Sequence, residues 1–294
     1  MSLRVLSFML FAVGVYPVKA QNIQKMNIWQ DSLLQLGQQM FQHEAEAERL
    51  ERNFVFIKTL VSALKEPNSY YYNFEKLDMI SVLSSPDNDF RIFSWNIPLQ
   101  DGSYLYYGSI QHKVAGGQLK LTPLLDRTFA FQKPTEEITS PEQWYGAQYY
   151  EIIPLSKQHY VLLGWKGHQA EYSKKVIEIL RMSPDGTITL GAPVFTDNPK
   201  MTRKVFSYAR TATMYLRHNA PLNRIEFDHI VAVAPEYEGN FQYYGPDLTH
   251  DAYELRGGRL VFRENIVLQA HEQGNESHYI DPLKSKNSRK SGIH

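Results

Sequence analysis

The chain of 294 residues carries 31 Lys and Arg against 31 Asp and Glu, so its formal net charge is zero, which excludes the basic surface of a nucleic-acid-binding protein. It contains no cysteine, which excludes disulfides, thiolate metal sites and a cysteine nucleophile. Its 19 Tyr, 15 Phe and 4 Trp make up 13% of the residues, and aromatic side chains favour half-buried strands.

The first twenty residues have the layout of a secretory signal peptide. Arg4 supplies a positive charge, an apolar run follows over residues 5–15, and Val18 and Ala20 precede a cleavage site after Ala20. The run is shorter than the roughly 20 apolar residues of a membrane-spanning helix. We therefore expect residues 1–20 to be removed during export. No later stretch predicts a membrane span, so we expect the mature chain to be soluble.

A helical repeat follows over residues 22–65, within a predicted N-terminal segment of residues 21–69. Its apolar positions alternate steps of three and four, which places them on one stripe of a helix. The pattern allows one long amphipathic helix or a helical hairpin whose helices meet near Gly37 or His43. The stripe is weak at His43 and Ala47, which favours packing on the protein's own β domain over a coiled coil. Its members are Trp29, Leu33, Leu36, Met40, His43, Ala47, Leu50, Phe54, Ile57, Val61 and Leu64.

From Tyr70 onward the repeat shortens to two residues, which is typical of strands. A short helix is the alternative for residues 175–182. Pairs that are typical of hairpin turns separate several of these segments: Asp101-Gly102, Gly116-Gly117, Asp185-Gly186 and Gly257-Gly258. The predicted strands cover residues 79–83, 90–97, 103–111, 118–124, 148–154, 159–165, 175–182, 187–194, 203–208, 212–217, 224–233, 252–255 and 259–262.

This density of strands predicts a mainly β protein with an N-terminal helix, in which residues 70–283 form an antiparallel β-sandwich or barrel. The motif Ser85-Pro86-Asp87 recurs as Ser183-Pro184-Asp185 before another strand. Because such motifs recur in β-propeller blades, propeller-like repeats are the alternative fold. Residues 284–294 are basic and polar, and we expect this tail to be disordered.

The β-rich region contains several distinctive phrases: residues 85–96, Tyr106-Tyr107-Gly108-Ser109-Ile110-Gln111, residues 160–165, Phe227-Asp228-His229-Ile230 and Tyr244-Gly245-Pro246-Asp247. They resemble phrases of an uncharacterised family of exported proteins from Bacteroidetes-type bacteria. The resemblance spans about residues 70–262. It implies an envelope location, with the periplasm favoured over the outer surface or secretion, and it transfers no activity and no catalytic residues.

The common catalytic signatures are missing. Ser62-Ala63-Leu64-Lys65 matches the Ser-x-x-Lys of penicillin-binding enzymes, but its companion motifs are absent and it ends an amphipathic helix. The richest polar stretch is 226–251. Strand alternation places His229 with the apolar residues, as a core histidine, and Glu226 and Asp228 on the opposite face. The loop residues that could bind a divalent metal, the one cofactor left open, are Glu236, Glu238, Asp247, His250 and Asp251.

The aromatic content allows two interpretations, namely core packing and flat platforms for sugars or other ring-shaped ligands. Core packing is the commoner role for any one ring. The aromatic residues that we select as candidate ligand contacts are Trp95, Tyr106, Trp165, Tyr243 and Tyr244.

Three functions are consistent with these features. The first is a non-catalytic envelope protein that binds a glycan, another small ligand or an envelope protein. The second is a metal-assisted envelope hydrolase that uses the acidic loops over residues 236–251. The third is a structural subunit that docks through an exposed apolar stripe on the N-terminal helix.

Overall fold

The helical repeat forms a hairpin of two helices, α1 (Ile23–Gln42) and α2 (Glu46–Leu64), in the computed structural model, which describes residues 22–268. The chain reverses at His43, one of the two positions that the sequence indicates. Arg49 holds the turn, because its Nη1 donates to the carbonyl oxygens of His43 at 3.1 Å and Glu44 at 2.6 Å. Its Nε donates to the carbonyl oxygen of Pro98 and so ties the turn to the adjoining sheet.

The predicted stripe is correct for α1 and only partly correct for α2. Leu33 and Met40 are fully buried, as expected. In α2 the buried face is formed around Phe56 and Leu60, whereas Phe54 is 57% exposed. The reversal at residues 43–45 interrupts the helical phase, so α2 turns a different face inward than a continuous helix would. The buried faces of both helices pack on the neighbouring sheet, which does not favour docking through this stripe.

Thirteen strands follow in three antiparallel sheets, and each predicted strand overlaps one of them. The first sheet has the order β1 (Ser81–Ser84), β2 (Phe90–Pro98), β3 (Tyr104–His112) and β4 (Lys120–Leu125). The second has β5 (Gln148–Pro154), β6 (His159–Gly167), β7 (Tyr172–Met182) and β8 (Ile188–Leu190), with β9 (Lys204–Ala209) paired to β7. The third has β10 (Leu216–Asn219), β11 (Arg224–Ala232), β12 (Tyr244–Arg256) and β13 (Arg259–Arg263).

Short 3₁₀ helices occupy several of the connections. They are η1 (Ser69–Tyr71), η2 (Thr128–Ala130), η3 (Pro141–Gln143), η4 (Ala220–Leu222), η5 (Pro235–Tyr237) and η6 (Phe241–Tyr243).

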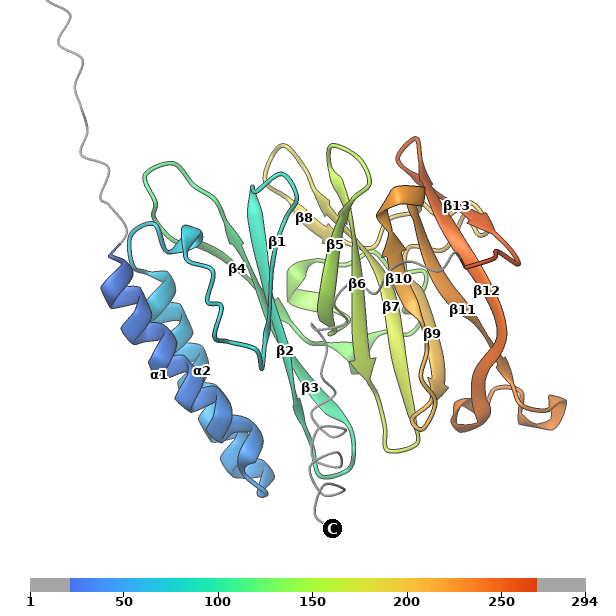
Figure 1. Ribbon diagram of the computed structural model, residues 1–294, viewed down its shortest axis with the longest axis horizontal. Coiled ribbons are helices and arrows are strands. Elements are labelled where there is room, and N and C mark those ends of the chain that lie inside the picture. The colour runs from blue at the N-terminus through green and yellow to red at the C-terminus, as the bar shows by residue number, and fades with distance from the viewer. Residues whose placement is uncertain (1–21, 269–294) are drawn as a thin grey trace, which may run out of the picture.

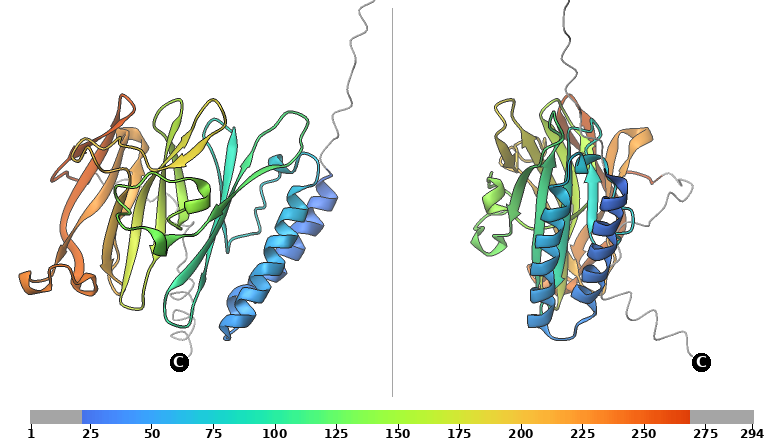
Figure 2. Two further views of the ribbon diagram at one scale, coloured as in Figure 1. Left: turned by 180° about the vertical axis from the view of Figure 1, so that it is seen from behind. Right: turned by 90° about the vertical axis from the view of Figure 1, so that its left-hand side faces the viewer.

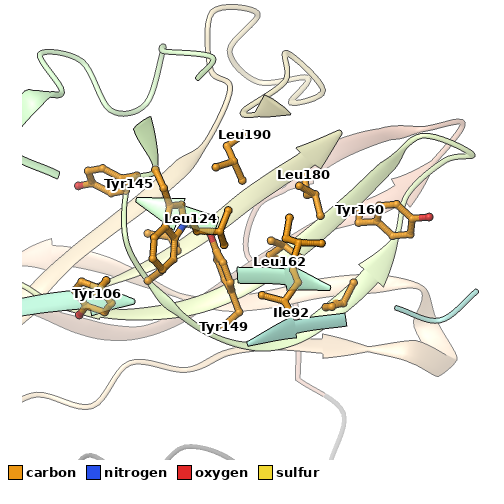
Figure 3. Close-up of a cluster of buried hydrophobic side chains, with 14 of the residues drawn as sticks. Ile92, Tyr106, Leu124, Tyr145, Tyr149, Tyr160, Leu162, Leu180 and Leu190 are labelled. Atoms are coloured by element: carbon orange, nitrogen blue, oxygen red, sulfur yellow. The ribbon is translucent and has the colours of Figure 1, made fainter. Parts of the chain in front are cut away.

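The helical hairpin and the three sheets are arranged as four layers in a row (Figures 1 and 2). Alternate residues of β2 face opposite ways: Phe93 belongs to the core shared with the helices and Ile92 to the core between the first and second sheets. Figure 3 shows part of this second core, including Ile92 and Leu162. Leu162 and Leu163 similarly belong to the cores on the two sides of the second sheet. The central sheet is therefore apolar on both faces.

The structure confirms a mainly β fold of antiparallel sheets that pack as a sandwich behind N-terminal helices. None of the three sheets described over residues 22–268 closes into a barrel. Their consecutive up-and-down order resembles that of propeller blades, but the row ends at the helices on one side and at the third sheet on the other (Figure 1). Residues 175–182 lie in strand β7, not in a short helix.

The predicted signal peptide, the basic tail over residues 284–294 and the last part of the predicted β domain lie outside the described residues. Within residues 22–268, neither helix has the length and apolarity that crossing a membrane requires.

Candidate functional site

A pocket of about 330 Å³ lies between the edge strand β9 and the β11–β12 hairpin. Its volume is at the lower end of the roughly 300–1,000 Å³ of small-molecule sites. Residues of the second sheet, the third sheet and η6 converge here from distant parts of the chain. The lining residues are Lys204, Val205, Phe206, Ser207, Phe227, Asp228, His229, Ile230, Phe241, Tyr244 and Asp251.

Aromatic rings form the apolar walls of this pocket. Phe206 and Phe227 face each other from two sheets, with ring centroids 5.0 Å apart. Phe241 contacts Tyr244 at 5.1 Å and Tyr172 at 5.4 Å. Phe206 and Phe227 are buried, whereas Phe241 and Tyr244 are half-buried. The outer wall therefore leaves part of its ring surface for a ligand.

The loop that carries Phe241 is fixed by its own contacts. The backbone N–H of Gly239 donates to Tyr244 Oη at 2.8 Å. Tyr237 and Tyr243 stack with ring centroids 4.1 Å apart. Gly239 has φ of 84°, a conformation that glycine adopts without steric cost. These contacts preorganise the outer wall.

A β-bulge reshapes the inner wall at His229. The register of β11 and β12 shifts between Asp228 and Ile230, so strict alternation fails there. His229 is consequently exposed, and its Nδ1 lies 2.9 Å from Asp247 Oδ2. The prediction of a core histidine was therefore wrong, because the sequence pattern gives no sign of the bulge.

Two carboxylates beside the pocket already have hydrogen-bond partners. Asp228 accepts from the backbone N–H of Tyr215 at 2.6 Å, and its other oxygen lies 3.1 Å from His250 Nε2. Asp251 accepts from the backbone N–H of Asn265 at 3.0 Å. Both residues are more than nine-tenths buried. Their hydrogen bonds hold β12 against β11 and against the chain that follows β13.

The ammonium group of Lys204, unlike these carboxylates, has no hydrogen-bond or ion-pair partner in the described part of the chain. Burial lowers the pKa of its ammonium group, an effect that the nearby charges of Asp197 and Asp251 oppose. Among residues 22–268, Lys204 Nζ donates no hydrogen bond and forms no ion pair within 4.0 Å. It lies over the ring of Phe206, 5.7 Å from the ring centroid. The pocket therefore presents a partly desolvated cation that still has donors to offer.

The structure does not bring the predicted metal ligands together. Glu236 lies in η5 and Glu238 follows it, both exposed. The prediction of loops was wrong for Asp247, His250 and Asp251, which lie in β12. Asp247 pairs with His229 and His250 with Asp228, so they belong to separate pairs. No group of three His, Asp or Glu side chains in the described part of the chain is placed to hold a metal ion.

The predicted ligand-contacting rings also separate into two groups. Trp95, Tyr106 and Trp165 are at most 4% exposed and belong to the cores. Tyr106, visible in Figure 3, donates its hydroxyl to the carbonyl oxygen of Gly167 at 3.0 Å. Tyr244 lines the pocket, and Tyr243 lies next to it with 39% of its surface exposed.

Sequence reasoning missed the β9 side of the pocket and the ring of Phe241. One local signal was present: Lys204 alternates with Phe206 and so places a charge on an apolar strand face. That strand's proximity to residues 227–251 is a tertiary contact, which no local pattern indicates.

No protein-family model and no curated protein matches this chain. The geometry of the pocket therefore carries the functional argument.

Proposed function

We propose that this chain is an exported, non-catalytic binding protein of the bacterial envelope, located in the periplasm. Its ligand occupies the pocket between β9 and the β11–β12 hairpin. The observation that carries this proposal is the convergence of partly exposed rings, Phe241 and Tyr244, with the ammonium group of Lys204, which has no hydrogen-bond or ion-pair partner within residues 22–268. An apolar pocket with a few convergent polar groups is the usual form of a binding site. The signal-peptide pattern of residues 1–20 supports export.

Binding is favoured over hydrolysis by the state of the carboxylates. A glycoside hydrolase needs one carboxyl group to donate a proton and a second to attack or to activate water. The carboxylate oxygens of Asp228 and Asp247 are instead engaged in hydrogen bonds that hold the strands and the bulge in place. The metal-assisted alternative would require a cluster of ligands, and the five candidate residues do not form one.

Thermal denaturation of the full chain with three probe sets tests this function: neutral and acidic oligosaccharides, peptidoglycan fragments, and acetylated hexapeptides. A ligand that binds only the native state must raise Tm. We expect at least one probe set to do so, and we expect Phe241→Ala to weaken its binding about tenfold or more. Phe129→Ala is the control, because Phe129 is 81% exposed and does not line the pocket.

Three results would contradict the proposal. The first is the absence of any Tm shift with all three probe sets, and the second is equal weakening of binding by both variants. The third is chemical conversion of a bound probe, detected by mass spectrometry, which would favour the hydrolase.

A further inference from the structure

Strand β9 has one paired edge and one open edge. It pairs with β7 alone within residues 22–268. Next to this ladder, the N–H of Arg210 donates to the carbonyl oxygen of Glu171 at 2.9 Å. Hydrogen-bonded and non-hydrogen-bonded pairs alternate in an antiparallel ladder. Residues 204, 206 and 208 therefore bond to β7, and Val205 and Ser207 direct their N–H and C=O groups to the open edge. Ala209 directs its N–H to the same edge, whereas its carbonyl oxygen accepts from the N–H of Ala212 at 2.9 Å.

The pocket runs along this open edge. Four consecutive residues, 204–207, line it. The side chain of Val205 packs into the core between the first and second sheets, away from the third sheet, whereas Phe206 belongs to the core on the other side. Val205 consequently reaches the pocket with its backbone. Unpaired strand edges of this kind are templates for another strand.

Resting on the proposed function, we propose that the ligand is an extended peptide segment of another protein that adds to β9 as a further antiparallel strand. Its backbone pairs with Val205 and Ser207, whose open groups repeat at the two-residue period of a strand, about 6.6 Å apart. A peptide matches that alternation of donors and acceptors residue by residue, which sugar hydroxyls do not. Main-chain pairing of this type gives affinity, and pockets for alternate side chains give specificity.

The side chains around the edge define the peptide's composition. Alternate side chains of the bound peptide point toward the third sheet, where they meet Phe206, Phe227 and Phe241. We therefore expect the peptide to carry one apolar or aromatic side chain at this position. Lys204 lies at the start of the same edge without a hydrogen-bond or ion-pair partner in the described chain, whereas Asp228 and Asp251 have theirs. A carboxylate of the peptide, from Asp, Glu or the C-terminus, complements that charge.

The probe is an arrayed library of acetylated hexapeptides with Phe, Leu or Tyr at one position and Asp, Glu or a free C-terminus at another. We expect binding by the full chain, with the Val205 and Ser207 amides slowed in hydrogen exchange by tenfold or more. Peptide binding without that protection would overturn the strand addition. Binding of oligosaccharides alone would overturn it too, while leaving the proposed function intact. Binding of no probe would end both proposals.

Proline substitution separates pairing on the open edge from folding. Ser207→Pro removes an N–H that β7 does not use, and proline is tolerated on edge strands. We expect this variant to fold and to bind the selected peptide about tenfold more weakly, because one bond is lost and a peptide acceptor is left unpaired. Ala209→Pro is the matched control, since Ala209 lies on the same edge beyond the pocket and its variant should bind normally. Equal binding by all three proteins would contradict the proposal.

An N-methyl scan of the peptide gives the same test on the unaltered protein. Methylation of every second peptide amide should reduce binding about tenfold, because those amides pair with β9, whereas methylation of the intervening amides should not. A uniform effect would overturn the strand addition.

The contact between the peptide carboxylate and Lys204 can be tested by changing both partners. Replacing Glu with Gln in the peptide should weaken binding to the unaltered protein severalfold, and should weaken binding to Lys204→Met much less. Equal losses in the two proteins would remove Lys204 from the site.

Discussion

The Nδ1 atom of His229 lies 2.9 Å from Asp247 Oδ2, across the bulge where β11 and β12 lose register. Asp247 also accepts from the hydroxyl of Thr249 at 2.7 Å and from its backbone N–H at 3.0 Å. Hydrogen bonds from Thr249, followed by that from His229, lower the pKa of Asp247 to about 2. Together these contacts hold Leu248, the residue between Asp247 and Thr249, at φ of 73° with 88% of its surface exposed.

Leu248→Gly should therefore stabilise the protein. A left-handed conformation costs an L-residue about 1–2 kcal/mol, and an exposed leucine contributes little burial in return. The larger unfolded-state entropy of glycine offsets part of the gain, so we expect about 0.5–1 kcal/mol more free energy of unfolding. Leu248→Ala is the control, because alanine keeps the unfavourable φ and should not stabilise. Urea denaturation measures both, and a glycine variant no more stable than the alanine variant would contradict the argument.

The sequence predicted the sheets because their signals are local. The strand expected over residues 90–97 forms β2 (Phe90–Pro98), and the Gly-containing turns, such as Asp185-Gly186, recur where they were expected. The long strand β12 was predicted only over residues 252–255, because the polar sequence around Asp247 predicts a loop. A bulge and a left-handed Leu248 allow such residues within a strand.

The candidate site was predictable only in part. Tyr244 and Asp251, which were selected from the polar and aromatic stretch of residues 226–251, both line the pocket. Trp95 and Trp165 are buried in the cores instead, because a buried ring and a ligand-binding ring have the same local pattern. Lys204 and Phe206 reach the pocket only through the packing of the second sheet against the third, which depends on the whole chain.

Export can be tested on the N-terminus of the protein recovered from a Bacteroidetes-type host. We expect the periplasmic chain to begin at Gln21, because the small side chain of Ala20 suits cleavage after it. Ala20→Arg should retain the precursor, as a bulky charged residue does not fit that position. Lys19→Arg is the control and should be cleaved normally. Recovery of the intact chain, still starting at Met1, in the cytosol would contradict this prediction.

The buried ion pair between Arg203 and Glu178 should dominate the stability of the second sheet. Arg203 Nε lies 2.5 Å from Glu178 Oε2, and the two side chains are 0% and 1% exposed. Glu178→Gln leaves an uncompensated buried guanidinium, so we expect a loss of about 3–5 kcal/mol in the free energy of unfolding. Chemical denaturation measures this loss.

A surface pair provides the control for Glu178→Gln. Glu136 lies 3.6 Å from Lys133 and its side chain is 40% exposed, so Glu136→Gln should cost about 0–1 kcal/mol. Replacing both Glu178 and Arg203 with Met should cost less than Glu178→Gln alone, because no charge is left buried. Equal losses for the buried and surface variants would show that this ion pair has no special weight.

Lys166 should make the stability of the protein rise with pH above neutrality. Its Nζ donates to Thr128 Oγ1 and to the carbonyl oxygens of Tyr145 and Gly146, at 2.7–2.8 Å. Burial, reinforced by the charges of Lys174 and Arg203 and opposed by Asp126, lowers the pKa of Lys166 to about 7. In the unfolded chain a lysine titrates near 10.4. Between these values the unfolded state binds more protons, so raising the pH favours the fold.

The expected slope is at most about 1.4 kcal/mol of unfolding free energy per pH unit between pH 7 and 10. Lys174 contributes in the same direction, because burial lowers its pKa to about 8. The informative quantity is therefore the difference between the unaltered protein and Lys166→Met, in which the effect of Lys174 cancels. Urea denaturation at pH 7, 8 and 9 should show this difference changing with pH in favour of the unaltered protein. Lys133→Met, at an exposed site, is the control: its unfolding free energy should change with pH in the same way as that of the unaltered protein. If the unfolding free energy of Lys166→Met had the same pH dependence as that of the unaltered protein, the three acceptors of Lys166 would keep its ammonium group charged in the folded state.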